Sequence, residues 1–332
     1  MSAAIAISPR DTGQVSPAAD TAEPGADLLR AVAAAYGLQT PSSAERLTGG
    51  FANDVFLLKD DPPVVLHIKH PPLDLQSLSW EHELLALLRP YLPEIPAPMR
   101  TLSGRTLLLH EERPVWLTPY VPGEPAEPAD RRAVAMALGR LHAVQLEVEP
   151  RPGHPRLRDI PIPPLRPMPP AFDSWLPLIT SARTETIELI SRIATTRQAT
   201  VGVTHNDIFP GNVLVHNGHV TGLLDWEEAD VDWLVWDLAS SILPFCSTAD
   251  GDLDISATQG FLDAYRAASG RVEPEEDDLI VPLLRAKRIL EVLRAPTDRH
   301  PRWDYQLQNL RAYQLLGQEG DEVPGWPCIP IS

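Results

Sequence analysis

Two residue types in one short segment could do chemistry together. Residues 205–212 read H-N-D-I-F-P-G-N, and Asp207 within them could accept a proton from a hydroxyl group. Asn212 ends the segment, and Asp225 follows further along the chain. An amide oxygen and a carboxylate oxygen are hard ligands of the kind that Mg²⁺ prefers. An ordinary loop would also contain Asp and Asn, because both favour turns, so the segment alone leaves both interpretations open.

The residues between Asn212 and Asp225 predict a β-hairpin. Two β-rich runs flank Asn217 and Gly218, a pair that strongly favours a two-residue turn. A hairpin returns the chain to the place where it began. We therefore expect the side chains of Asn212 and Asp225 to lie at the same end of the hairpin, where they could share one cation.

A lysine upstream could hold phosphate oxygens. The chain is poor in lysine, since only three of its 28 basic residues are lysines, at positions 59, 69 and 287. Lys69 follows an apolar, β-rich run, and its ammonium group could hold phosphates while paired with a carboxylate; a plain edge-strand lysine is the alternative. Glu81 has leucines three, four and seven residues on, beside a buried helical stripe, so it is the preferred partner and Glu83 is the fallback.

Taken in order, these motifs resemble those of the aminoglycoside phosphotransferase-like family, kinases of small molecules that share the protein-kinase architecture. The resemblance is carried by H-x-D-x-x-x-x-N at His205, Asp207 and Asn212, and by Asp225 in L-D-W-E. It runs from about residue 47 to residue 293. The same segment, together with W-D-L-A at residues 236–239, is similar to the homoserine-kinase branch.

The resemblance implies a role for each motif. Asp207 would be the catalytic base, Asn212 and Asp225 would hold Mg²⁺ beside ATP, and His205 and Asp237 would support the loop. Further residues would bind the nucleotide, although the glycine pair among them would also suit a plain hairpin bend, and the last two a plain linker between lobes. These nucleotide-binding candidates are Gly49, Gly50, Asn53, Lys69, Glu81, Pro119 and Val121.

The order of predicted elements, together with the resemblance, indicates an α+β, bilobal, protein-kinase-like fold. At 332 residues the chain is long enough for two lobes. A small antiparallel-sheet N-lobe would cover residues 27–119 and a larger, mostly helical C-lobe residues 120–320, with tails at 1–26 and 321–332. Expected strands are 53–59, 64–70, 105–109 and 115–117, and expected helices are 27–36, 79–88, 130–144, 175–194, 253–268 and 275–293.

Three further features have both a structural and a functional interpretation. The proline-rich segment 150–170 predicts a surface loop, either a connector or a flap over the substrate. Acidic residues follow Asp225 directly and would either attract an ammonium group at the mouth of the site or form a solvated turn; they are Glu227, Glu228, Asp230 and Asp232. The tryptophans at 226, 233 and 236 favour packing over substrate stacking, and the acidic run 273–278 favours helix capping.

Composition and charge exclude several classes of protein. The formal net charge of −17 argues against nucleic acid as a partner and favours a cationic or zwitterionic ligand. The two cysteines, Cys246 and Cys328, match no disulfide framework or zinc spacing, so we expect a cytoplasmic protein. The first 26 residues lack the pattern of a secretory signal, and no apolar stretch is long enough to span a membrane.

The sequence therefore predicts an ATP-dependent phosphotransferase that moves the γ-phosphoryl group to a hydroxyl of a small, amine-bearing molecule. Amino sugars and homoserine-like amino alcohols both suit an acidic mouth, and the sequence leaves the choice open. The alternative is a catalytically silent nucleotide-binding or scaffold protein that kept the fold. Against it, each reactive position holds the residue type that the reaction needs.

Overall fold

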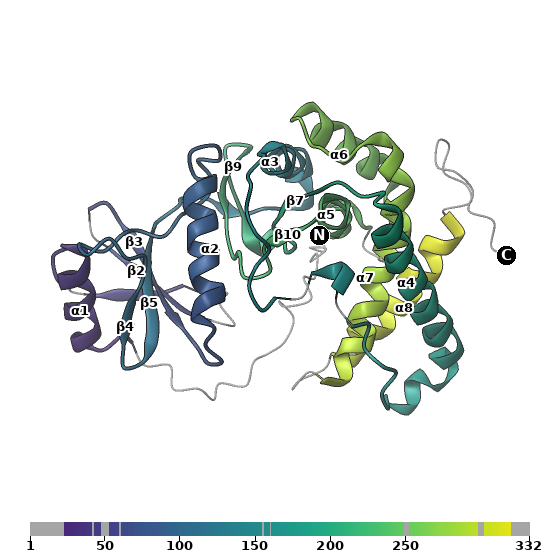
Figure 1. Cartoon of the computed structure of the whole chain (residues 1–332), viewed down its shortest axis with the longest axis horizontal. Coiled ribbons are helices and arrows are strands. Elements are labelled where there is room, and N and C mark those ends of the chain that lie inside the picture. Colours follow the sequence, from purple (N-terminus) through teal and green to yellow (C-terminus); the bar gives the residue numbers. More distant parts are fainter. Residues whose placement is uncertain are drawn as a thin grey trace, which may run out of the picture.

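An antiparallel sheet of five strands forms the first lobe, in the order β1-β2-β3-β5-β4 (Figure 1). The computed structural model describes residues 23–41, 43–47, 53–59, 61–154, 156–159, 161–248, 252–297 and 302–319. The strands are β1 Ala44–Arg46, β2 Asn53–Leu58, β3 Val64–Lys69, β4 Leu108–His110 and β5 Arg113–Pro119. Alternate residues of β3, such as Leu66 and Ile68, pack against helix α1 (Ala26–Tyr36). Lys69 therefore ends the strand on the opposite face, level with Asn53 of β2.

Helix α2 (Leu75–Leu88) connects the two lobes. It begins four residues before the predicted start at residue 79, because Asp74 caps it by accepting a hydrogen bond from the amide of Ser77 at 3.0 Å. Leu84, Leu85 and Leu88 on its buried face belong to the main core of the second lobe. In Figure 1 it stands between the sheet and strand β9 (His219–Leu223).

Two small antiparallel units form the strand part of the second lobe. In the first, β6 (Glu124–Pro125), β8 (Val213–His216) and β9 pair in that order. Asn217 and Gly218 have φ values of 50° and 73°, which the two-residue turn requires, so the predicted hairpin is confirmed. The second unit, β7 (Val201–Thr204) paired with β10 (Asp230–Trp233), was not predicted.

Helices make up most of the second lobe (Figure 1). They are α3 Arg131–Ala143, α4 Leu176–Thr196, α5 Leu234–Cys246, α6 Ile255–Ala267, α7 Ile280–Arg294 and α8 Trp303–Glu319. Short 3₁₀ segments are η1 Pro128–Asp130, η2 Leu157–Asp159, η3 Pro170–Trp175, η4 Pro210–Asn212, η5 Pro274–Leu279 and η6 Ala295–Thr297. The sequence did not predict α5 or α8. Helix α5 is buried nearly all round, polar residues included, and it contains Pro244, a residue that argues against a helix in sequence-based prediction.

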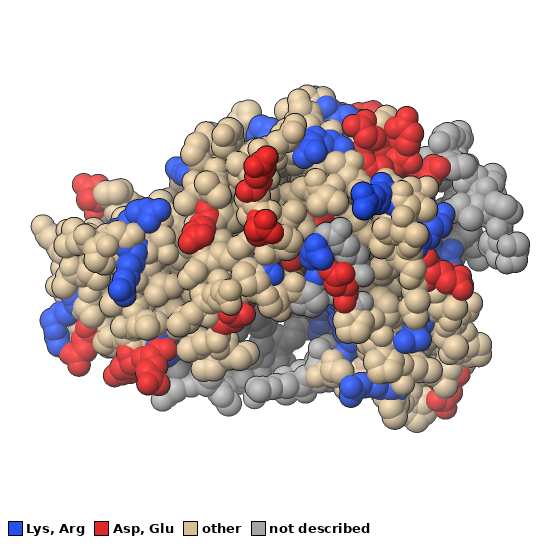
Figure 2. All heavy atoms as spheres, in the orientation of Figure 1, with Lys and Arg blue, Asp and Glu red and all other residues tan. Residues whose placement is uncertain are grey.

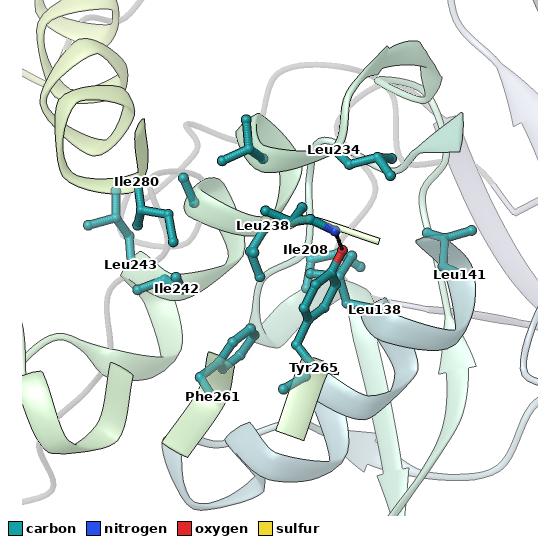
Figure 3. Packing of buried hydrophobic residues seen from close by; sticks show 14 of the residues in the cluster. Leu138, Leu141, Ile208, Leu234, Leu238, Ile242, Leu243, Phe261, Tyr265 and Ile280 are labelled. Atoms are coloured by element: carbon teal, nitrogen blue, oxygen red, sulfur yellow. Dashed lines mark hydrogen bonds between the residues drawn. The ribbon is translucent and has the colours of Figure 1, made fainter. Parts of the chain in front are cut away.

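The hydrophobic core of the second lobe packs against the segment 205–212. Ile208, which is 3% exposed, inserts between Leu138 of α3 and Leu238 of α5 (Figure 3). Tyr265 of α6 lies in the same cluster, and the dashed line in Figure 3 marks the hydrogen bond that its hydroxyl accepts from the amide of Val272. A side chain adjacent to Asp207 is thus fixed in close-packed surroundings.

The tryptophan and capping predictions are both confirmed. Trp226 and Trp233 are each 2% exposed, and Trp236 packs against the same core. In the acidic run, Glu273 and Glu276 form a reciprocal capping box at the start of η5.

None of the described helices is long and apolar enough to cross a bilayer. On the face drawn in Figure 2, the basic side chains of the described residues are scattered among acidic ones.

Two glycines in helices predict opposite effects on stability. A Cβ atom on Gly139 of α3 would lie 2.4 Å from the carbonyl oxygen of Tyr265, so Gly139→Ala should lower the free energy of unfolding by about 1–3 kcal/mol through overpacking. Gly260 of α6 has nothing within 4 Å, so Gly260→Ala should raise it by roughly 0.5–1 kcal/mol through helix propensity. Urea unfolding of both variants measures these changes, and stabilisation by Gly139→Ala would contradict the α3–α6 packing.

Candidate active site

The carboxylate of Asp237, in the first turn of α5, anchors the loop that carries Asp207. It accepts hydrogen bonds from the backbone amides of His205 at 2.6 Å and Asn206 at 2.9 Å, and it lies 3.1 Å from Nε2 of His142. Asp237 is fully buried. Burial raises the pKa of its carboxyl, but the hydrogen bond and charge of His142 outweigh this effect and hold the pKa below its ordinary value. A buried, ionised group therefore fixes the start of the loop.

His205 uses both ring nitrogens within the same region. Its Nε2 lies 3.0 Å from the carbonyl oxygen of Leu224, and its Nδ1 accepts from the amide of Asp207 at 3.3 Å. Burial lowers its pKa, which keeps the ring neutral and suits it to one donor and one acceptor role. His205 thus connects the loop to the end of the β8–β9 hairpin.

Asp207 and Asn212 are joined directly. The side-chain nitrogen of Asn212 donates to the carboxylate of Asp207 at 2.9 Å and to its carbonyl oxygen at 3.0 Å. With the nitrogen bound in this way, the amide oxygen of Asn212 is the atom left to bind a cation. The loop therefore sets the orientation of both side chains.

The hairpin brings Asp225 back to Asn212. The amide of Leu224 donates to the carbonyl oxygen of Asn212 at 2.8 Å, and Asp225 follows with a left-handed φ of 58°. An amide oxygen and a carboxylate at one end of a hairpin fit Mg²⁺ as a set of hard oxygen donors. The described residues contain no cluster of three or more His, Cys, Asp or Glu side chains that could hold a metal ion. Any cation here would take its remaining ligands from elsewhere.

The predicted ion pair between Lys69 and Glu81 is not formed. The ammonium of Lys69 instead lies 2.8 Å from Oε1 of Glu227, which also accepts from the side chain of Asn53 at 2.8 Å. Glu81 pairs with Arg151, with 3.2 Å between Oε2 and Nη2. The physical reason is position. Glu81 of α2 is buried against the second lobe, where Arg151 reaches it. Glu227 extends from the loop after Asp225 toward Lys69 of β3.

The choice of Glu81 rather than Glu83 as the inward-facing acid is consistent with burial. Glu81 is 7% exposed and Glu83 lies on the exposed face of the same helix. Burial raises the pKa of Glu81 to about 7, an effect that the charge of Arg151 only partly offsets.

Two of the acidic residues after Asp225, Asp230 and Asp232, fit neither the acidic mouth nor the solvated turn that the sequence suggested. Asp230 and Asp232 are 1% and 2% exposed, so they neither line an open mouth nor form a solvated turn. Asp230 accepts from the amide of Arg151 at 2.8 Å, and Asp232 accepts from the amide of Leu157 at 2.5 Å. His154 binds Asp230 as well, and its hydrogen bonds with Asp230 and Glu228 raise its pKa to about 9. These contacts fix the first part of the proline-rich segment against the site.

The remaining nucleotide-binding candidates divide into two groups. Gly49 and Gly50 lie outside the described residues. In the linker, Pro119 ends β5 and has no N–H, and the amide of Tyr120 donates to the carbonyl oxygen of Pro63 at 3.2 Å. The amide of Val121 makes no hydrogen bond to any described residue.

Sequence reasoning missed the roles of four residues of this region, of which Glu227 had been named only as an acid at the mouth of the site. Arg151, Glu227 and His142 bind the predicted residues directly, but their partners are distant in sequence and no local pattern identifies them. For Lys287 of α7, the only signal in the sequence was weak: lysine is scarce in this chain. Burial lowers its pKa, while the charges of Glu291 and Asp207 oppose that shift.

The raised pKa of Glu81 predicts a pH-dependent stability. Because the folded state holds this proton more tightly than the unfolded state, ionisation of Glu81 costs stability. The free energy of unfolding of the wild type, relative to Glu81→Gln, should fall as pH rises from about 4.5 to about 7, by at most about 3 kcal/mol, and then stay level. Urea unfolding between pH 4.5 and 8 measures the difference, with Glu83→Gln as the exposed control. Parallel curves for the wild type and Glu81→Gln would contradict the assignment.

A family model and several curated proteins match this sequence. Residues 43–275 match the model of the phosphotransferase enzyme family. The homoserine kinase of Gluconobacter oxydans (strain 621H) is 25% identical over 261 residues, which cover 74% of this chain and 79% of that protein. The homoserine kinase of Pseudomonas aeruginosa (strain UCBPP-PA14) is 28% identical over 243 residues, or 71% and 75% of the two chains.

Solved structures show the same fold. A microcompartment-associated aminopropanol kinase superposes with a TM-score of 0.65 at 14% identity, over 87% of this chain and 94% of that one. The predicted bilobal, kinase-like α+β fold and the resemblance to small-molecule kinases are therefore confirmed. Because the family model spans more than half of the sequence, the chain belongs to the phosphotransferase enzyme family.

Proposed function

We propose that this chain transfers the γ-phosphoryl group of ATP to the hydroxyl of a small amino alcohol, and that the acceptor is homoserine or a close analogue. The observation that carries the proposal is the hydrogen bond between Asn212 and Asp207, in a loop anchored on Asp237. It fixes a carboxylate beside a pair of oxygen ligands. Phosphoryl transfer asks a protein mainly for such positioning and for charge stabilisation.

Each residue has a distinct part in the proposed reaction. Asp207 would orient the acceptor hydroxyl and take its proton. Lys69, fixed by Glu227, would hold phosphate oxygens, and the amide of Val121, to which no described residue is hydrogen-bonded, would bind the adenine ring. Mg²⁺, when bound by Asn212 and Asp225, would supply positive charge against the phosphates. His205 and Asp237 would keep the loop in place without touching substrate.

The acceptor is inferred from the relatives and from charge. The curated relatives reported above are homoserine kinases that match this chain over about three quarters of its length. The net charge of −17 favours an acceptor that carries an ammonium group. Glu228, with 48% of its side chain exposed, is the acid after Asp225 most open to solvent. A cytoplasmic location, where ATP is available, suits the reaction and the buried free thiol of Cys246.

Phosphorus NMR tests the proposal directly. The wild-type protein with ATP and Mg²⁺ should convert L-homoserine into a phosphate monoester, and should do so faster than 1-amino-2-propanol or an aminoglycoside. Transfer to the aminoglycoside alone would contradict the proposed acceptor. Binding of ATP without transfer to any of the three would favour the catalytically silent alternative.

Asp207→Asn separates chemistry from binding in the same assay. Loss of a general base should lower kcat by about 10²-fold or more, while calorimetry should find ATP affinity nearly unchanged, because Asp207 is assigned to the acceptor. Asn can still meet Asn212 at this position, so the loop should fold. An unchanged kcat would exclude Asp207 from the proposed role.

A further inference from the structure

Arg151, in the proline-rich segment after α3, is the most highly connected buried cation of the described residues around the site. It is 8% exposed, and its guanidinium lies between α2 and the loop that follows Asp225. Nε donates to the hydroxyl of Ser77, and Nη2 donates to Glu81 at 3.2 Å. Nη1 donates to three backbone carbonyl oxygens. It lies 3.3 Å from that of Trp226 and 3.5 Å from that of Ala229, and it makes a short contact with that of Glu227.

This arrangement requires an arginine. A buried charge is costly unless it is paired and hydrogen-bonded on all sides. The planar guanidinium presents donors in several directions at once, which a lysine ammonium on a flexible stem does not reproduce. The guanidinium also lies 5.8 Å from the centre of the Trp80 ring. All the donor groups of Arg151 are therefore committed to two elements, α2 and the loop 226–230.

The loop contacts lead directly to Lys69. Arg151 binds the carbonyl oxygens of Trp226 and Glu227, so it fixes the backbone from which the Glu227 side chain projects. The carboxylate of Glu227 in turn holds Lys69 and Asn53 on adjacent strands. A displacement of this backbone would move the ammonium group of Lys69 as well.

We propose that Arg151 is a positioning residue of the phosphate site: it fixes the loop after Asp225 against α2, and through Glu227 it sets the position of Lys69. The proposal rests on the function proposed above, in that Lys69 must bind ATP. Arg151 itself touches neither substrate. Arg151 forms the ion pair with Glu81 that the sequence had predicted for Lys69.

Arg183 provides a matched control. From α4 it binds the same proline-rich segment, donating to the carbonyl oxygens of Pro163 at 2.8 Å and Ile162 at 3.4 Å. None of its hydrogen bonds reaches a site residue in the described part of the chain. A variant at this position should therefore loosen the segment without moving Lys69.

The test compares Arg151→Gln, Arg151→Lys and Arg183→Gln with the wild type. Calorimetry without acceptor measures the Kd for ATP, steady-state kinetics measure KM for ATP, KM for L-homoserine and kcat, and thermal unfolding measures Tm. Arg151→Gln should raise Kd and KM for ATP about tenfold or more, with KM for homoserine nearly unchanged. Arg151→Lys should recover part of the loss, because it restores the charge beside Glu81. Arg183→Gln should bind ATP like the wild type.

The outcomes separate a positioning role from a structural one. If Arg151→Gln lowers Tm but keeps wild-type Kd and KM for ATP, Arg151 is structural only and the proposal is overturned. If Arg151→Gln does not fold, Arg151→Lys decides by the same comparison, since wild-type ATP binding in that variant would also overturn the proposal. If the wild type binds ATP but does not phosphorylate homoserine, the proposed acceptor is contradicted. The calorimetric test of Arg151 is still valid in that case, because it uses ATP alone. A wild type that does not bind ATP would overturn both.

Discussion

The buried carboxylate of Asp237 is the constraint on which the site depends. A fully buried anion must be satisfied by donors, and this one takes two from the backbone of residues 205 and 206 and pairs with His142. His142 is held in turn by the hydroxyl of Tyr265 at 2.8 Å, deep in the core. Because Ile208 is buried on the other side, Asp207 lies between two fixed points of the chain. Its position therefore follows from core packing.

The lobes are joined by alternating charges. From α2 outward, Glu81 pairs with Arg151, Arg151 binds the loop of Glu227, and Glu227 pairs with Lys69. The inner pair is buried and its energy depends on complete hydrogen bonding, whereas the outer pair is partly exposed to solvent, which screens it. Lys69 is attached at the partly exposed end of this network. Such an arrangement connects Lys69, the proposed phosphate ligand, to the loop that follows Asp225, the proposed metal ligand.

Local signals in the sequence predicted the elements that depend on local physics. The Asn217 and Gly218 pair specified the hairpin, and the periodic leucines of α2 identified its buried face. Helix α5 was missed because Pro244 lies inside it and its polar residues, Asp237 among them, are buried rather than exposed. Strands β7 and β10 were missed because each is short and finds its partner far along the chain.

Ion-pair partners were the least predictable feature. Lys69 and Glu81 have the residue types and order that the family resemblance implies, yet each has a different partner, supplied from 70 or more residues away in sequence. The partner of Glu81 comes from a proline-rich segment whose sequence predicts only a loop. Burial of Asp230 and Asp232 has the same origin, since the backbone that they bind lies far from them along the chain. Such contacts are properties of the tertiary structure.

Lys69, the proposed phosphate ligand, is held by Glu227 in the loop that follows Asp225, and on this pair the proposed site depends. A double-mutant cycle of Lys69→Met and Glu227→Gln, followed by kcat/KM for ATP, tests it most directly, with Lys69→Met and Glu81→Gln as the comparison cycle. The account predicts that Glu227→Gln adds little loss once Lys69 is replaced, while the effects of Lys69 and Glu81 come closer to multiplying. Independent effects of Lys69 and Glu227, with strong coupling of Lys69 to Glu81, would contradict it.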